Sequence, residues 1–213
     1  MEELEHKDKI LKAAAELFSK YGVRSVSMDD IARHLSISKK TIYQYFADKE
    51  DIVISAAREH MGRNKATFEA IHRNAVSAID ELVKLSKQLR IEMEGLNPAL
   101  LFDLQKYHPK AWNLWIEHKA VDIRNLVISN LKQGIEEGDF RPEINPTVIA
   151  TLRLEQVQIA FDDRVFPHDR FPLAEVQVQI FEHFVYGLLT EKGRKLFEKY
   201  KKEIKELTPN TTH

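Results

Sequence analysis

The stretch "SISKKTIYQYF", residues 36–46, gathers ammonium, hydroxyl and amide groups that bind nucleic acid. Lysine and tyrosine side chains bind phosphate oxygens, and a glutamine amide can pair with the edge of adenine in the major groove. Within the helix expected after Ser38, only Ile42 and Phe46, four residues apart, are clearly apolar, so this helix would have two anchors and a wide polar face. From Arg33 to Lys49 the local net charge is +3, although the whole chain has a net charge of -1. The pattern favours a helix that binds DNA.

Two short helices joined by a tight turn would hold this polar face in place. The sequence predicts a first helix at 28–35, with Ser27 as its cap and Asp30 completing a capping box. Ser38 is the expected cap of the second helix. A helix-turn-helix of this kind brings the N-terminal part of its second helix close to base edges in the major groove.

Helical patterning continues along the rest of the chain, and strand-like alternation is scarce. A preceding helix would end at Gly22, and Asp48 would cap a long helix that leads out of the N-terminal unit. Proline is favoured at the first helical position. The prolines that mark expected helix starts are Pro98, Pro109 and Pro146. The helical patterns that follow cover 109 to about 134–138, 147–163, 173–190 and 193–207.

The predicted fold class is all-α, in two domains. An N-terminal three-helix helix-turn-helix domain for DNA binding is expected at 1–54. A C-terminal helical bundle for ligand binding and dimerisation is expected at 55–207, and a flexible tail at 208–213. The linking helix from 48 would belong to both domains.

Composition excludes several other classes of protein. The 213 residues are 43% hydrophobic and 31% charged, which is ordinary for a soluble globular protein. The chain has no cysteine, which excludes disulfides, thiolate metal sites and cysteine nucleophiles. No histidine pair has metal-ligand spacing, and no phosphate loop or nucleophile elbow is present, so we expect no metal, cofactor or catalytic residue. The charged start "MEELEHKDKI" and the lack of a long apolar run predict a cytoplasmic protein with no membrane partner.

Residues 8–54 carry a longer set of spaced matches than a bare helix-turn-helix. The matches in the first two helices are Ala14, Leu17, Phe18, Gly22, Ser27, Met28, Ile31 and Ala32. The matches in the next two are Ser38, Lys39, Thr41, Ile42, Tyr43, Tyr45, Phe46, Lys49 and Glu50. With this spacing the stretch resembles the N-terminal domain of the TetR (tetracycline-repressor) family of bacterial transcription regulators. The later segment "LKQGIEEGDFRPEINP" looks like the end of a long family helix and the following loop.

The resemblance implies a transcriptional repressor that binds a pseudo-palindromic double-stranded operator as a homodimer. It also implies a small-molecule effector, expected to be hydrophobic or aromatic, bound by the C-terminal bundle. It implies phosphate contacts by the two tyrosines and Lys49, a base or phosphate contact by Thr41, and a backbone contact by Ser27. The residue pattern and the resemblance together give the predicted DNA-binding set, which is Ser27, Ser38, Lys39, Lys40, Thr41, Tyr43, Gln44, Tyr45 and Lys49. Two positions depart from the family pattern, because Ser36 and Lys40 stand where glycine is common.

Aromatic and polar residues of the C-terminal half are candidates for ligand binding. Trp112 and Trp115 are three apart on one helix face, although aromatic side chains also dominate ordinary cores. Arg153 and Gln156 interrupt an otherwise apolar helix, and an inward polar group needs a partner, which a ligand can supply. A dimer-interface or surface position is the alternative. The candidate set is Phe102, Tyr107, Trp112, Trp115, Arg153 and Gln156.

The 173–190 helix is apolar on more than one side, whereas a monomer needs only one buried stripe. Its two stripes are Val176, Ile180, Phe184 and Leu188, and Val178, Phe181, Val185 and Leu189. The additional apolar stripe predicts contact with a second copy, in a four-helix interface with the 147–163 helix. The first stripe is the predicted dimer interface.

Two other classes of function remain open at this point. A helical enzyme with a small-molecule cavity would need catalytic residues, and no recognisable set is present. A ligand-binding adaptor that kept the fold without binding DNA would be expected to lose the DNA face. The intact set of Tyr43, Tyr45 and Lys49 argues against that adaptor.

Overall fold

The computed structural model describes residues 2–207, so the predicted flexible tail at 208–213 lies outside the described residues. Within this range helices form all the regular structure except one isolated antiparallel bridge between Phe140 and Leu189, which confirms the all-α fold class. The first helices are α1 (Glu2–Tyr21), α2 (Met28–Leu35), α3 (Lys39–Tyr45), α4 (Lys49–Arg73), α5 (Ala78–Met93) and α6 (Leu100–Tyr107). They are followed by α7 (Pro109–His118), a π-helical segment (Lys119–Ile123), α8 (Arg124–Glu136), α9 (Pro146–Ile159), α10 (Leu173–Leu188) and α11 (Glu191–Leu207).

Local signals fix the ends of the first four helices as the sequence predicts. Gly22 ends α1 with a φ of +81°, a left-handed conformation that suits glycine. The Ser27 hydroxyl accepts from the Asp30 N–H at 3.2 Å, and the Asp30 carboxylate accepts from the Ser27 N–H at 2.8 Å, so the capping box forms. Ser36, with a φ of 55°, adopts the left-handed conformation between α2 and α3.

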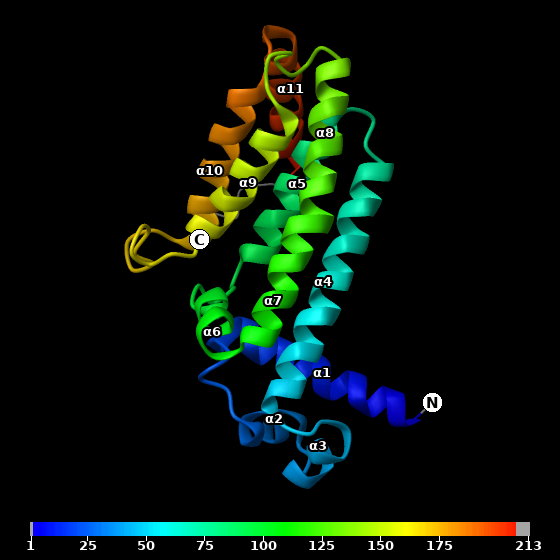
Figure 1. Ribbon diagram of the computed structural model, residues 1–213, viewed down its shortest axis with the longest axis vertical. Helices are drawn as coiled ribbons and strands as arrows, with labels where there is room; N and C mark the ends of the chain where they lie inside the picture. The colour runs from blue at the N-terminus through cyan, green and yellow to red at the C-terminus, as the bar shows by residue number, and fades with distance from the viewer. Residues whose placement is uncertain (1, 208–213) are drawn as a thin grey trace.

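The helix-turn-helix shares one core with the neighbouring helices. This core also receives Leu104 of α6 and Ala111 of α7, and Trp112 packs against it. Its central side chains are Ile10, Phe18, Val23, Ile31, Ile42, Phe46, Ile52 and Val53. Figure 1 shows α1, α2 and α3 gathered at one end of the molecule, where α4 begins before it runs along the bundle.

The long helical pattern after Pro109 is interrupted in its middle. The π-helical segment Lys119–Ile123 separates α7 from α8, and Pro109 begins α7 as expected. Pro98 does not begin a helix, because two turn residues follow Asn97 and α6 starts only at Leu100. Pro146 does begin α9, where Asn145 accepts hydrogen bonds from the first-turn N–H groups. The predicted starts are therefore correct at two of the three prolines.

A second core fills the far end of the bundle, where α5, α8, α10 and α11 meet. The Phe140 ring is fully buried against the backbone of Gly134, so closely that a Cβ at Gly134 would overlap it. Both apolar stripes of α10 enter the interior, because α5 and α9 both pack on this helix. Val176, Phe184 and Leu188 are buried within the single chain, and Ile180 packs against a smaller third core.

The stripe predicted to form the dimer interface is therefore largely covered within a single chain. The sequence showed that α10 is apolar on two sides, but the second side faces neighbouring helices of the same chain. The residues of α10 that remain exposed are Glu175, Gln179, His183 and Gly187. None of the helices between residues 2 and 207 has the length and apolar character needed to cross a lipid bilayer.

Candidate functional site

Helix α3 is fixed from one side only. Ile42 and Phe46 are buried to 0% and 1% exposure, as the four-residue spacing predicts. The opposite side of α3 exposes Lys39, Lys40 and Gln44, and Tyr43 is 49% exposed. The structure therefore brings four of the predicted DNA-binding side chains together on one open face.

Three predicted hydroxyl residues take part in helix caps. The Ser38 hydroxyl accepts from the Thr41 N–H at 3.0 Å and lies 2.8 Å from the Thr41 hydroxyl. The Ser27 hydroxyl donates to Asp30 Oδ2 at 2.6 Å. The Ser27 hydroxyl also accepts from the Asp30 N–H, so Ser27 and Ser38 each satisfy a free N–H group at the starts of α2 and α3. Ser27, Ser38 and Thr41 thus lie at the N-terminal ends of the two helices, the ends best suited to an anion.

The charges on this face are not equivalent. Lys39 Nζ donates to Asp29 Oδ2 of α2 at 2.8 Å, and this bond raises the pKa of Lys39. Lys40 makes no ion pair with any residue that the structure describes. Lys40 can therefore bind a phosphate without losing another partner. Lys39 must first break its ion pair with Asp29.

Two predicted residues lie away from the open face. Tyr45 is half-buried, packs against the first core and stacks on His6 with ring centroids 6.3 Å apart. Lys49 Nζ donates to the Val23 carbonyl at 2.6 Å, and burial lowers the pKa of Lys49 although Asp103 favours its charged form. Lys49 therefore ties α4 to the turn after α1. This contact depends on tertiary packing and left no signal in the sequence.

Helix α6 joins the helix-turn-helix to the rest of the molecule. Asp103 Oδ2 accepts from the Arg24 N–H at 3.0 Å, next to Gly22. The Asn97 N–H donates to the Ser19 carbonyl at 2.7 Å. These contacts attach the α1–α2 turn to elements that also line an internal cavity.

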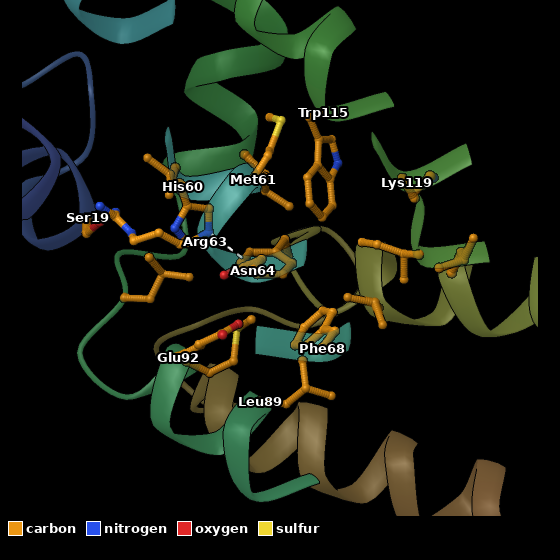
Figure 2. A pocket seen from close by; sticks show the side chains of 18 of the residues that line it. Ser19, His60, Met61, Arg63, Asn64, Phe68, Leu89, Glu92, Trp115 and Lys119 are labelled. Carbon is orange, nitrogen blue, oxygen red and sulfur yellow. Dashed lines mark hydrogen bonds between the residues drawn. The ribbon is translucent and has the colours of Figure 1, made fainter. Parts of the chain in front are cut away.

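A cavity of about 400 Å³ lies behind the helix-turn-helix, enclosed mainly by apolar side chains of α1, α4 to α10 and the π-helical segment. Its volume is in the range of small-molecule binding sites. Figure 2 shows Ser19, Arg63 and Glu92 on one side and Trp115 and Lys119 on the other. Space for a ligand is therefore present in the folded chain.

Several polar groups of the cavity wall are already paired. Lys119 Nζ donates to Glu155 at 2.9 Å and to Gln158 at 2.6 Å, both on α9. The buried Glu81 carboxylate accepts from Asn130 at 2.8 Å and lies 3.0 Å from His72 Nδ1. Arg153 differs, since it is 5% exposed and makes no hydrogen bond or ion pair with any described residue.

The cavity contains two of the six predicted ligand residues, Trp115 and Arg153. Phe102 is 53% exposed on the outer side of α6, where Lys106 covers its ring. Tyr107 is exposed beside Arg24. Neither side chain belongs to the cavity lining, because α6 turns its apolar leucines inward and its aromatic rings outward.

Trp112 and Gln156 also lie outside the cavity lining. Trp112 packs against the first core. Gln156 has a buried Oε1 without a partner among the described residues. Sequence reasoning missed His60 and Asn64 of α4, which line the cavity and lie 3.3 Å apart. Their spacing of four on one helix face was the available signal.

No metal cluster is evident in the described range: between residues 2 and 207, no three histidine, aspartate or glutamate side chains converge as metal ligands would.

Comparison with known proteins places this geometry in a family. Residues 10–56 match the family model described as bacterial regulatory proteins, tetR family. The fatty acid metabolism regulator protein of Bacillus subtilis is 23% identical over 184 residues, which cover 84% of this chain and 93% of that protein. The HTH-type transcriptional regulator UidR of Escherichia coli is 27% identical over 154 residues, 69% of this chain and 75% of that protein.

Solved structures share the fold. A TetR-family transcriptional regulator from Agrobacterium tumefaciens superposes with a TM-score of 0.73 at 18% identity, covering 88% of this chain and 100% of that one. The transcriptional regulator FadR from Bacillus subtilis, in complex with stearoyl-CoA, gives a TM-score of 0.60 at 20% identity, covering 84% and 97%. The family match lies on the helix-turn-helix, and the relatives extend over most of the chain. At residues 10–56 the chain therefore carries the N-terminal helix-turn-helix of the tetR family of bacterial regulatory proteins, and solved regulators of that family share its fold over most of its length.

Proposed function

We propose that the chain is a homodimeric repressor that binds a pseudo-palindromic operator through α3 and is released by a ligand in the cavity. The open polar face of α3, held from behind by two buried anchors, carries this proposal. Lys39, Lys40 and Tyr43 would bind phosphates, and Gln44 would read a base edge in the major groove. Two-fold symmetry would set the half-sites about one helical turn apart or a multiple of it.

The outer face of α9 supports a dimer. Val148, Leu152 and Ile159 are 60%, 50% and 43% exposed, and their spacing places them on one side of α9. The exposed face of the neighbouring α10 includes Gly187, which allows a close helix approach. Exposed apolar side chains grouped in this way are typical of a protein interface. Two copies of α9 and α10 would then form the four-helix interface through these exposed residues. The buried stripe of α10 would not take part in it.

Helix α4 supports coupling between ligand and operator. Its first turn contacts the α1–α2 turn through Lys49, and its middle lines the cavity with His60 and Asn64. A ligand releases DNA only to the extent that it binds the non-DNA conformation more tightly. A ligand that shifts α4 would change the separation of the two α3 helices in the dimer.

Selection of bound duplexes from a random DNA pool, with the purified chain at moderate salt, tests the proposal. We expect enrichment of a pseudo-palindrome. Weak binding that depends steeply on salt, without enrichment, would instead support the adaptor. The enriched duplex then becomes the assay for effectors.

Two substitutions then separate affinity from sequence recognition. Tyr43→Ala should weaken binding to all duplexes alike, because phosphate contacts carry no sequence information. Gln44→Ala should relax the preference at one base pair of each half-site. Tyr21→Ala is the matched control, since Tyr21 is also 49% exposed but lies at the end of α1. Unchanged affinity of Tyr43→Ala at several salt concentrations would contradict the docking through α3.

A further inference from the structure

Arg153 is a buried cation without an anion. It projects from α9 into the wall of the cavity and is 5% exposed. None of its nitrogens bonds to a residue within the described range, and Nη1 is completely enclosed. Buried charges in proteins are normally paired, because removing a charge from water without a partner is strongly unfavourable.

Two aromatic rings offset part of this cost. The Arg153 guanidinium lies 5.2 Å from the Phe181 ring centroid and 5.4 Å from that of Phe184. Such contacts are favourable but supply no hydrogen-bond acceptor. Burial lowers the pKa of Arg153 to about 10, so the guanidinium stays protonated at neutral pH. The charge therefore remains in the cavity wall with its donors unused.

Other charged residues of the cavity do not supply the missing anion. Glu81 is bonded to Asn130, and Glu92 accepts from Gln88 at 2.8 Å. Burial also raises the pKa of Glu92, which disfavours its charged form. Lys119 is paired with Glu155, and Arg63 with Glu59. Glu94 also lines the cavity but is exposed to solvent, so Arg153 remains the buried charge without a partner among the described lining residues.

We propose that the cavity binds a carboxylate with an apolar body, and that Arg153 forms the ion pair with its carboxylate. A guanidinium presents paired N–H donors that match a carboxylate in two parallel hydrogen bonds. The apolar lining around it, which includes Leu154, Val157 and Phe161, would receive the hydrocarbon part. This inference rests on the proposed function, since it names the class of effector for that same cavity.

Trp115 adds a second donor and a reporter. Its indole Nε1 is buried without an acceptor among the described residues, in the wall of the same cavity. The chain has two tryptophans, and Trp112 lies outside the lining. Filling the cavity should therefore change the emission of Trp115 while Trp112 serves as a constant background.

The test compares decanoate with decanol, its uncharged counterpart, by calorimetric titration and tryptophan emission of the full chain at neutral pH. Decanoate should bind the natural chain, and Arg153→Met should weaken that binding about tenfold to a hundredfold, the range expected for charge-assisted hydrogen bonds. Decanol affinity should change less than about threefold. Arg63→Met is the matched control, because Arg63 lines the same cavity but pairs with Glu59.

Thermal unfolding provides an independent readout that a purely structural arginine would not give. Without ligand, Arg153→Met should unfold at the same or a higher temperature, because methionine removes an uncompensated buried charge. Decanoate should raise the unfolding temperature of the natural chain and not that of the variant. A ligand-free variant that is strongly destabilised would show that Arg153 is structural and would overturn the proposal.

Three further results would overturn it. One is equal affinity for decanoate and decanol that does not change in Arg153→Met. Another is binding of decanoyl-CoA that is tight and equally indifferent to Arg153→Met, since the recognition would then lie elsewhere. The third is no binding of decanoate at all.

If decanol binds the cavity and releases DNA while decanoate does not, the carboxylate proposal fails but the proposed function stands. If decanoate binds through Arg153 without changing operator affinity, the carboxylate site stands and the proposed regulation fails.

Discussion

Asp29→Asn should make the protein bind its operator more tightly. Asp29 holds Lys39 at 2.8 Å on the open face of the helix-turn-helix, where phosphates are expected. In the natural chain Lys39 must give up this partner before it contacts DNA. Asparagine removes the competing charge and nearly preserves the shape. The α2 cap remains, because Ser27 and Asp30 form it without Asp29.

The expected gain follows from the exposure of the pair. The two side chains are 44% and 59% exposed, and exposed ion pairs are weak because water and salt screen them. Releasing such a pair should raise the affinity of one half-site roughly two- to fivefold. A dimer uses two half-sites, so the gain for a full operator should be about four- to twenty-fivefold.

Fluorescence anisotropy with the selected duplex, over a series of salt concentrations, measures this gain. The comparison needs Asp29→Asn, Lys39→Met and the double variant. Asp29→Asn should raise operator affinity much less when Lys39 is already methionine, because the competing ion pair no longer exists. An equal gain in both backgrounds would show that Asp29 acts by repelling DNA directly. No gain in the natural background would refute the competition between Asp29 and phosphate.

Three further substitutions test stability and assembly. Gly62→Ala should raise the free energy of unfolding by about 0.5–1 kcal/mol in urea titrations, because Gly62 lies inside α4 and its Cβ would meet open space. Gly134→Ala should lower it by at least about 1–3 kcal/mol in the same titrations, because the Cβ would overlap the buried Phe140 ring. Leu152→Glu should shift sedimentation from dimer to monomer, whereas Ile91→Glu, at a 65% exposed position on α5, should leave the dimer intact. Equal effects of the two glycine substitutions, or a dimer that survives Leu152→Glu, would contradict the corresponding geometry.

The sequence predicted local features well because they depend on neighbouring residues. The capping box at Ser27 and Asp30, the helix end at Gly22 and the two anchors of α3 involve positions at most four apart along the chain. Such signals depend on backbone hydrogen bonds and helix periodicity, which a single sequence records directly. The exposed position of Tyr43 followed from the same periodicity.

Features that depend on distant packing could not be predicted in this way. Periodicity shows that α10 has two apolar sides, but not that both are covered by helices of the same chain. The inward turn of Lys49 depends on the Val23 carbonyl, which is 26 positions away. Phe102 and Tyr107 are as aromatic as any cavity residue. The contact of Asp103 with the α1–α2 turn, together with the packing of Leu104 in the first core, fixes which side of α6 faces out. Arg153 does lie in the cavity wall, and it could be singled out because a charge in an otherwise apolar helix needs a compensating partner; its contact with a ligand stays a prediction.

The π-helical segment between α7 and α8 has a consequence for comparing this chain with its relatives. A π turn accommodates an extra residue, and one residue corresponds to about 100° of rotation in an α-helix. If the extra residue stood in a regular α-helix instead of the π turn at Lys119–Ile123, it would rotate α8 by roughly that angle relative to α7. Asn130 would leave Ala78 and Glu81, and Leu131 would leave the core. A relative that lacks this extra residue should be aligned with a gap inside the helix, although no loop marks the place.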